Sequence, residues 1–378
     1  MGYSKRVRIG MRLRKLRKNG GNMKRKKKEV LFYAMTVLGC VVAMTIVVTA
    51  AIMIYDKIRD RKENEDAIQA STGANIISYS QEEVDLMLAD AVAQAEDNMR
   101  EQVSEDILNQ IRMDLEAGTS TVQTLRPLYP NHIVVVSNSV FHFVPIRDDL
   151  KKSSLLQENL HLLESGELQY IENGEVTSHK GIDVSRYQGS INWEKVAASG
   201  VEYAFIRVGI RGYGQEGNLV LDERFDQNAK NALAAGIKVG VYFFSQAITV
   251  EEALEEADMV LDAIEGYDIT YPIVYDVEKT SDKTGRMNQI SVEQRTLMAR
   301  TFIDRIKEAG YTPMIYANME MWSVLIDMSE FEDVEKWFAY YDTDLYFPYE
   351  YAVWQYSDTG RIDGITGDVD LNISFKEW

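Results

Sequence analysis

Residues 272–278 have the sequence PIVYDVE, a short apolar run that ends in two carboxylic acids. A run of this length, rich in β-branched and aromatic residues, is typical of a buried β-strand. Successive side chains of a strand point to opposite faces, so Val274, Asp276 and Glu278 share one face. We therefore expect this strand to bury one apolar face and to carry a pair of acids at the end of the other.

Similar apolar runs alternate with helical segments throughout residues 179–378. This alternation predicts the α/β class with a parallel sheet, and eight strands predict that the sheet closes into a barrel. The last three strands leave little room for helices, so we predict an irregular β/α barrel with about five helices. A doubly wound open sheet is the alternative. We predict strands at 180–185, 202–209, 237–244, 272–278, 312–317, 334–341, 350–356 and 367–372, and helices near 192–199, 222–235, 250–265, 290–309 and 319–327.

The acids lie where such a barrel would place its chemistry, at the carboxyl ends of strands. Asp183 ends the first predicted strand, and Asp276 and Glu278 end the fourth. Two carboxylates in a partly closed mouth repel each other, so one of them should keep its proton. A proton donor beside an anion is what cleavage of a glycosidic bond requires. The alternative is a solvated acid pair at a strand end.

Five motifs in this region follow one another in a fixed order: 180–185 (KGIDVS), 241–244 (VYFF), 276–278 (DVE), 354–357 (WQYS) and 367–372 (GDVDLN). Together they resemble glycoside hydrolase family 25, the lysozymes that are N-acetylmuramidases. The resemblance covers about residues 179–378 and implies an irregular β/α barrel with five helices. It implies hydrolysis of the β-1,4 bond between N-acetylmuramic acid and N-acetylglucosamine in peptidoglycan, without a cofactor or metal.

The same resemblance assigns roles to the acids. Glu278 matches the general acid, and Asp276 matches the carboxylate that stabilises an intermediate formed by the substrate's own acetamido group. Direct attack by Asp276 is the alternative. Asp183 and Asp370 match acids that line the same cleft. The residues matched to sugar binding are Tyr242, Arg207, Trp354 and Gln355; Arg207 stands where many members of the family have lysine.

Residues 30–55 form an uncharged apolar run, long enough for a helix that crosses a membrane. Residues 1–28 hold thirteen Lys or Arg and no acid, and such a flank stays in the cytoplasm. We therefore predict a basic cytoplasmic segment (1–29), a transmembrane helix (30–55) and an extracellular remainder on a bacterial plasma membrane. A cleaved signal peptide is the alternative, although the run is long for one.

The segment between the membrane and the barrel divides into two parts. Residues 56–126 predict a helical stalk, in which residues 81–117 carry an alanine-rich apolar stripe. The stripe either mediates self-association or packs on its own neighbours. Residues 127–178 predict a small β-rich module with a hairpin around Asn173-Gly174. This module is either a packing adaptor or a wall-binding element.

Composition excludes several functions. The net charge is −18 and the basic residues cluster at the N-terminus, which disfavours nucleic-acid binding by the remainder. One cysteine and four histidines favour neither disulfides nor a metal centre. The acids at 251, 252, 255 and 256 suggest a solvated helix face. The sequence thus predicts a membrane-anchored lysozyme, and the alternative is a non-catalytic wall-binding or scaffolding module of a membrane assembly.

Overall fold

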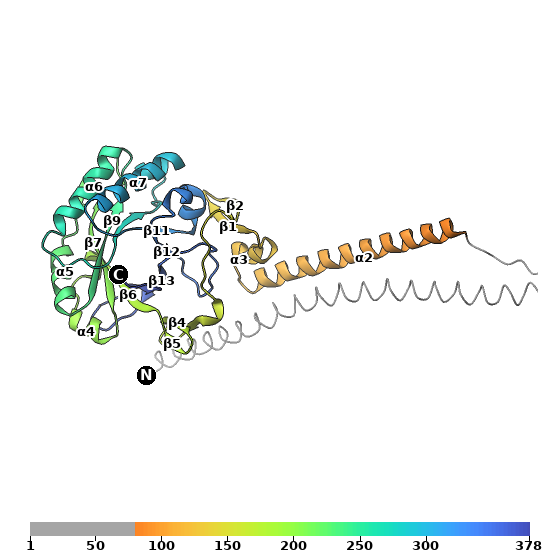
Figure 1. The fold of residues 1–378 in the computed structure, drawn as a ribbon, viewed down its shortest axis with the longest axis horizontal. Coiled ribbons are helices and arrows are strands. Elements are labelled where there is room, and N and C mark those ends of the chain that lie inside the picture. Colours follow the sequence, from red (N-terminus) through yellow and green to blue (C-terminus); the bar gives the residue numbers. More distant parts are fainter. Residues whose placement is uncertain (1–79) are drawn as a thin grey trace, which may run out of the picture. The chain divides into compact units, whose positions relative to one another are not determined.

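The computed structural model of the protein describes residues 80–378. The chain divides into two units after Glu116, and residues 117–378 form one compact unit that contains the barrel (Figure 1). In the first unit the structure describes one helix, α2 (Gln81–Glu116), which was predicted at 81–117. The predicted transmembrane segment 30–55 lies outside the described residues. Among residues 80–378, no helix has both the length and the apolar character needed to cross a membrane.

Eight strands close into the predicted barrel. Strand β14 runs antiparallel to both of its neighbours, β13 and β6, and β6 pairs in parallel with β7, which closes the ring and excludes the open sheet. A short strand that was not predicted, β8 (Leu219–Leu221), pairs with β7 outside the ring. The barrel strands are β6 (His179–Val184), β7 (Tyr203–Arg211), β9 (Lys238–Ser245), β10 (Ile273–Val277), β11 (Pro313–Asn318), β12 (Glu335–Ala339), β13 (Val353–Gly360) and β14 (Val369–Ser374).

Helices cover the outer face of the first strands, as predicted. Helices α5 and α6 pack on β7 and β9, and α7 packs on β10 and β11 (Figure 1). Helices α6 and α7 begin at residues suited to capping: the Thr249 side chain accepts from the Glu252 amide, and Ser291 forms a capping box with Gln294. The helices are α4 (Trp193–Ala198), α5 (Phe225–Ala234), α6 (Val250–Ala263), α7 (Val292–Glu308) and the π-helix η5 (Met321–Leu325).

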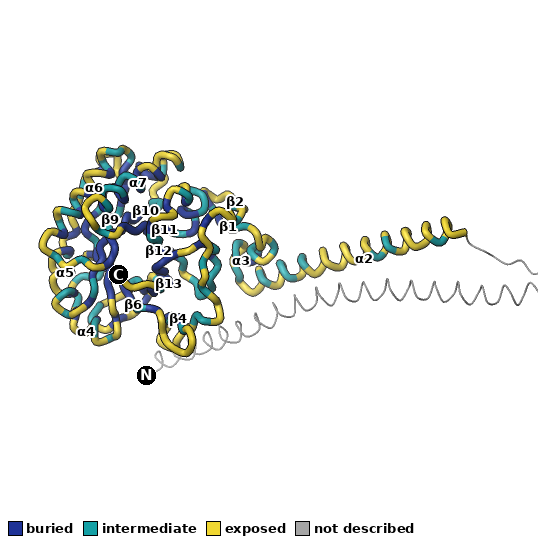
Figure 2. The backbone as a smooth tube through the Cα atoms, viewed as in Figure 1, coloured by how far each residue is buried: buried dark blue, intermediate teal, exposed yellow. Residues whose placement is uncertain are grey.

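The barrel strands contribute to two separate apolar cores. Phe205, Val274 and Trp337 belong to the core inside the barrel, where the rings of Phe205 and Trp337 stack with their centroids 4.5 Å apart. Ile273 and Tyr275 belong to the outer core, beneath the helices. This division confirms the alternation expected for 272–278, and the barrel strands are accordingly the most buried part of the molecule (Figure 2).

Residues 117–178, which we term the N-terminal cover, pack on the remaining strands. No helix follows β12 or β13. Instead, Ile133, Leu168 and Tyr170 of the cover share the outer core with Phe375, and the rings of Tyr170 and Phe375 lie 5.4 Å apart. The cover comprises α3 (Thr121–Leu125), η1 (Arg126–Leu128), β1 (His132–Ser137), β2 (Val140–Pro145), η2 (Gln157–Asn159), β3 (Leu160–Leu162), β4 (Leu168–Glu172) and β5 (Glu175–Val176).

The predicted hairpin lies between β4 and β5. Asn173 and Gly174 adopt φ angles of 53° and 87°, the left-handed conformations that a two-residue hairpin turn requires. The local sequence thus specifies the turn, and of the two strands it joins, β4 places Leu168 and Tyr170 in the outer core while β5 is exposed.

Candidate active site

Four carboxyl groups converge at one end of the barrel. Asp183 lies at the end of β6 and pairs in register with Asp370 of β14, so these two side chains are neighbours across the strands. Asp276 is the last residue but one of β10, and Glu278 comes directly after the strand. The charge of Asp183 raises the pKa of both Asp276 and Glu278, so Asp183 lies within electrostatic range of this pair. The structure therefore brings together all four predicted acids.

Burial is the main cause of the altered acidity in this cluster. The side chains of Asp276 and Asp183 are only 4% and 5% exposed, whereas Glu278 and Asp370 are half-buried. Burial raises the pKa of Asp276 and of Glu278, and the charge of Glu278 raises that of Asp276 further. Burial and the charge of Asp183 raise the pKa of Asp370 to about 9. At neutral pH the cluster therefore retains protons that isolated carboxyl groups would lose.

Neutral donors fix the orientation of Asp183. Its Oδ2 atom accepts from Gln355 Nε2 and from Asn372 Nδ2, both at 2.8 Å. The amide oxygen of Asn372 in turn accepts from Trp337 Nε1 at 2.8 Å. The two amide donors lower the pKa of Asp183, although burial raises it more. Asp276 shares a hydrogen bond with Glu278, which raises the pKa of Asp276 and lowers that of Glu278, and its buried Oδ1 atom has no hydrogen-bond partner within residues 80–378.

Two tyrosines donate hydrogen bonds to the side-chain carbonyl oxygen of Gln355. Tyr316 and Tyr341 each donate a hydroxyl hydrogen bond of 2.8 Å to Gln355 Oε1. Tyr316 is buried inside the barrel, but Tyr341 is 53% exposed and follows β12 at its carboxyl end. The sequence interpretation did not include either tyrosine, nor Asn372. Asn372 could have been found, because it lies two residues after Asp370 on the same face of a strand.

The predicted sugar-binding residues occupy different places. Tyr242 lies against Trp337 inside the barrel, and the charges of Asp183 and Asp276 raise its pKa beyond the effect of burial. Arg207 lowers the pKa of Asp276 and pairs with the buried Asp222, with Nη2 at 2.7 Å from Oδ2. These two residues and Gln355 therefore border the carboxyl cluster.

Trp354 lies apart from the other three. Its side chain is 1% exposed, belongs to the outer core and donates from Nε1 to the Tyr340 carbonyl oxygen at 2.7 Å. The structure does not bring Trp354 into the carboxyl cluster.

Residues 182–365 match the model of the family described as Glycosyl hydrolases family 25. The chain carries a family 25 glycosyl hydrolase domain. Over 205 residues it is 31% identical to Lysozyme M1 of Streptomyces globisporus, covering 51% of this chain and 66% of that protein. Over 194 residues it is 28% identical to the autolytic lysozyme of Clostridium acetobutylicum, covering 51% and 55%. The chain thus spans about two thirds or less of these relatives.

A solved structure also resembles the domain. The modular autolysin LytC from Streptococcus pneumoniae has 22% identity and a TM-score of 0.48, over 64% of this chain and 57% of that one.

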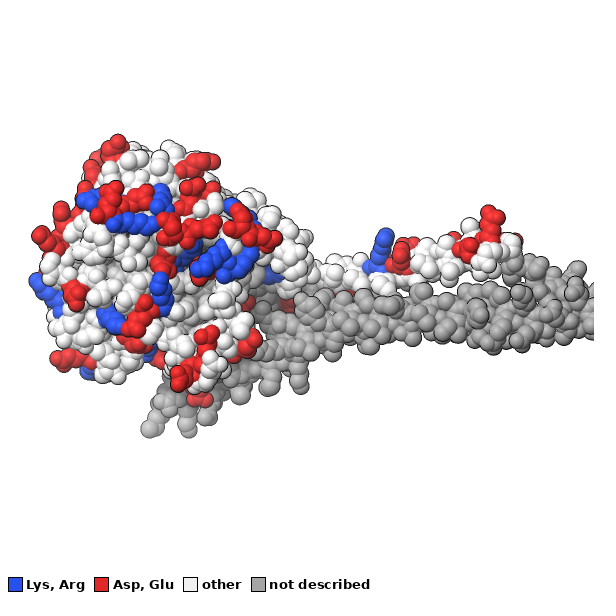
Figure 3. All heavy atoms as spheres, in the orientation of Figure 1, with Lys and Arg blue, Asp and Glu red and all other residues white. Residues whose placement is uncertain are grey.

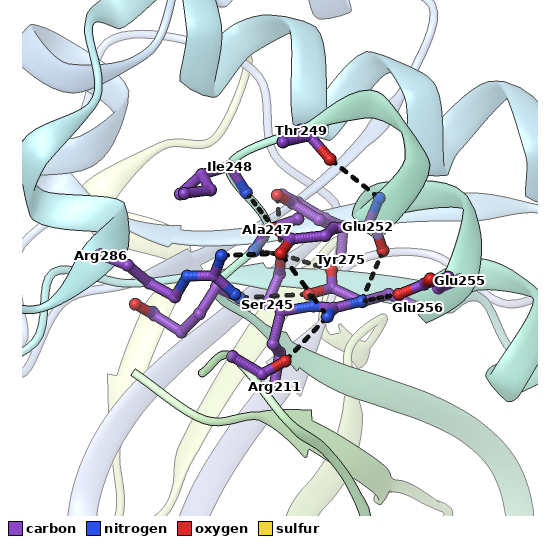
Figure 4. A network of polar contacts seen from close by, with 12 residues as sticks. Arg211, Ser245, Ala247, Ile248, Thr249, Glu252, Glu255, Glu256, Tyr275 and Arg286 are labelled. Atoms are coloured by element: carbon purple, nitrogen blue, oxygen red, sulfur yellow. Dashed lines mark hydrogen bonds and ion pairs between the residues drawn. The ribbon is translucent and has the colours of Figure 1, made fainter. Parts of the chain in front are cut away.

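A second buried polar network supports the loops of the family 25 domain (Figure 4). Arg211, at the end of β7, donates from Nε to Glu256 Oε1 of α6 at 2.8 Å. Glu256 also accepts from the Ser245 hydroxyl at 2.6 Å and from the Gln246 amide. The Gln246 side chain reaches the carbonyl oxygen of Glu278 at 3.5 Å. The network therefore connects α6 to the residues that carry the candidate acid.

One part of the sequence interpretation was wrong here. Glu256 was expected on a solvated face, but it is 0% exposed, and burial raises its pKa to about 7. The misleading signal was the run of acids on α6, and the deciding partner, Arg211, lies 45 residues earlier. Glu252 is partly buried and binds Arg286 at 2.7 Å.

The charged side chains on the visible face of the domain are of mixed sign. On the face shown in Figure 3, Lys and Arg are interspersed with Asp and Glu. Within residues 80–378, no group of His, Cys, Asp and Glu has an arrangement suited to a metal ion. The candidate site of the family 25 domain is therefore a cluster of carboxyl groups, amides and tyrosines.

Proposed function

We propose that the family 25 domain is an N-acetylmuramidase, which hydrolyses the β-1,4 bond between N-acetylmuramic acid and N-acetylglucosamine in peptidoglycan. The observation that carries this proposal is the pair formed by the buried Asp276 of β10 and the half-buried Glu278 just after this strand, each with a raised pKa. The similarity to Lysozyme M1 and to an autolytic lysozyme supports the substrate class.

In the proposed reaction Glu278 is the general acid. It is half-buried, so it can reach a substrate in the mouth while burial keeps its proton in place. Its proton moves to the glycosidic oxygen as the bond to the sugar's anomeric carbon breaks. The carbonyl oxygen of the N-acetylmuramic acid acetamido group then bonds to that carbon. Water later attacks the same carbon and returns a proton to Glu278, so the configuration is retained.

Asp276 stabilises the cyclic intermediate. The acetamido nitrogen becomes positively charged when its carbonyl oxygen attacks. A positive charge beside Asp276 favours the ionised form of this acid, whose pKa burial and Glu278 otherwise raise, and the carboxylate then binds the N–H group. The Oδ1 atom of Asp276, which accepts no hydrogen bond within the described residues, is available for this contact. The charge of Asp183 raises the pKa of Glu278 and so helps it to keep its proton, whereas Asp370, with a pKa of about 9, is itself protonated at neutral pH.

The proposal is tested by Glu278→Gln in the full chain, assayed on purified peptidoglycan. General acid catalysis contributes about 10²- to 10⁴-fold, so hydrolysis should fall by at least that factor. Glu251→Gln, an exposed acid on α6, is the matched control and should keep wild-type activity. New reducing ends should lie on N-acetylmuramic acid. A fully active Glu278→Gln chain, or reducing ends on N-acetylglucosamine, contradicts the mechanism.

We also propose that residues 30–55 anchor the protein in a bacterial plasma membrane, with residues 1–29 in the cytoplasm and the domain outside. The uncharged run and its basic flank support this orientation. Protease added to intact cells should remove the family 25 domain and leave the N-terminus protected. Digestion of the N-terminus instead would reverse the orientation, and a mature chain that begins near residue 51 would mean cleavage.

For the stalk we propose self-association through α2. None of its residues is buried, and large apolar side chains such as Leu86 and Leu108 are about two-thirds exposed. Sedimentation of the detergent-solubilised full chain should give a dimer or larger species, and replacing Leu86 and Leu108 with Gln should weaken it. A monomeric wild-type chain contradicts this proposal.

A further inference from the structure

The connection between β12 and β13, residues 340–352, is held by the N-terminal cover along much of its length. Gln123 Nε2 donates to Asp342 Oδ2 at 2.7 Å. Gln157 accepts from the Leu345 amide at 2.8 Å. The Tyr346 hydroxyl accepts from the Val134 amide at 2.8 Å. These polar contacts come from three separate segments of the cover, so the loop is fixed from outside the barrel.

Arg126 makes the most extensive contact with this loop. Its guanidinium group donates to the Tyr340 hydroxyl and lies 3.7 Å from the centre of the Tyr346 ring. It also reaches Met319 Sδ at 3.6 Å, in the segment that follows β11. A planar cation that is stacked on one ring and bonded to another fixes both rings at once.

Tyr341 lies between the two fixed residues Tyr340 and Asp342. It is the residue of this loop that reaches the candidate site, where its hydroxyl donates to Gln355 Oε1 at 2.8 Å. Gln355 in turn donates to Asp183 at 2.8 Å. Only two hydrogen bonds therefore separate the loop from the carboxyl cluster. Tyr341 is half exposed and lies near enough to the acids for the charges of Asp183 and Glu278 to raise its pKa, so it borders the mouth.

We propose that Gln123 and Arg126 are positioning residues for the glycosidase reaction, which act by holding Tyr341 and, through it, Gln355. This inference rests on the proposed function. Both residues precede the segment 182–365 that matches the family model, so the property belongs to this chain's own cover. A cover that served only to bury the outer core would need apolar contacts there, such as those of Ile133, and no polar contacts on either side of Tyr341.

Loss of the two contacts should loosen the loop without exposing the core. Residues 340–352 would then regain backbone freedom, and Tyr341 would spend less time over Gln355. Because Tyr341 borders the mouth, the loss should appear mainly as a raised KM for glycan strands. We expect roughly a 3- to 10-fold fall in kcat/KM, the rate equivalent of one or two hydrogen bonds.

The experiment compares four full-length chains: the wild type, Gln123→Ala with Arg126→Lys, Tyr341→Ala, and all three substitutions together. Glu167→Gln is the matched control, because Glu167 also joins the cover to the barrel but binds Lys180, near the start of β6. Activity is measured on soluble peptidoglycan strands, and amide hydrogen exchange is followed in peptides that cover residues 340–346.

The first two substitutions should lower kcat/KM and speed exchange at 340–346, whereas Glu167→Gln should change neither. In the Tyr341→Ala background the same two substitutions should lower kcat/KM by less than twofold, because the residue they position is gone. A full additional loss in that background, or unchanged kinetics in the first variant of an active enzyme, overturns the inference. A wild-type chain that hydrolyses no glycan overturns the proposed function, and this inference with it.

Discussion

The outer face of the barrel is covered by helices on one side and by the N-terminal cover on the other. Strands β7 to β11 lie beneath α5, α6 and α7, each of which follows the strand that it protects. Strands β12 to β14 are followed by no helix, and side chains of the cover join the outer core instead, where Tyr170 packs against Phe375, just after β14. The comparison teaches that an apolar strand face needs a partner, but that the partner need not be its neighbour in sequence.

The largest expected effect comes from removing the cover altogether. A chain of residues 179–378 exposes the outer face of β12 to β14 and loses the buried side chains Ile133, Leu168 and Tyr170. Burial of each large side chain stabilises by about 1.5–3 kcal/mol, so the total approaches the whole stability of a typical domain. We expect residues 179–378 to be insoluble or partly unfolded, as judged by circular dichroism, while residues 117–378 fold. Equal melting temperatures for the two chains would contradict this.

Two matched substitutions, each of which removes a buried side chain, test whether the cover and the helices contribute equally to the stability of the fold. Ile133 of the cover and Ile303 of α7 are 1% and 0% exposed in the same outer core. Each change to Ala should lower the free energy of unfolding by about 2–5 kcal/mol, measured by urea denaturation of the full chain. If Ile133→Ala has a negligible effect while Ile303→Ala does not, the cover is a loosely attached element.

A third prediction concerns Glu256, a buried acid on the helix-covered side of the barrel, and its effect on stability at different pH. Burial raises the pKa of Glu256 from 4.5 to about 7. The folded protein then binds a proton more tightly than the unfolded chain, so this group makes stability fall as pH rises from about 4.5 to 7. The expected loss is about 3 kcal/mol, and it should disappear in Glu256→Gln. Urea denaturation at pH 5 and at pH 8 measures this slope of stability against pH in the wild type and in Glu256→Gln.

The control for this titration is Glu255→Gln. Glu255 also binds Arg211, at 2.9 Å, but its side chain is 58% exposed. This variant should keep the wild-type slope. Identical slopes in Glu256→Gln and the wild type would mean that Glu256 is ionised across the range.

Local sequence periodicity made the helix-covered side predictable. The alternation in 272–278 correctly placed Val274 inside the barrel and Ile273 outside it. The convergence of Asp183 with Asp276 followed from the rule that parallel strands end at one edge. These features depend on backbone geometry, which neighbouring residues specify.

The remaining features depend on contacts between distant segments. No pattern near Glu256 indicated that Arg211 would bury it, and none near Tyr341 indicated that it would reach Gln355. The packing of the cover on β12 to β14 is of the same kind, because an apolar strand face does not specify what covers it. Tertiary packing decides which side chains from distant segments meet, and local sequence patterns do not reveal these partners.

The smallest expected effect concerns ion pairs, which occur on both sides of the barrel. Lys151 of the cover binds Glu350 at 2.7 Å, and Arg305 of α7 binds Asp258 of α6 at 2.7 Å. All four side chains are at least a third exposed, so water screens both pairs. Lys151→Gln and Arg305→Gln should each change the free energy of unfolding by less than about 1 kcal/mol. Urea denaturation at low and at 0.5 M salt would measure both. A larger loss in Lys151→Gln alone, abolished by salt, would mean that charge holds the cover in place, whereas two small and equal losses leave apolar burial as the common cause on both sides.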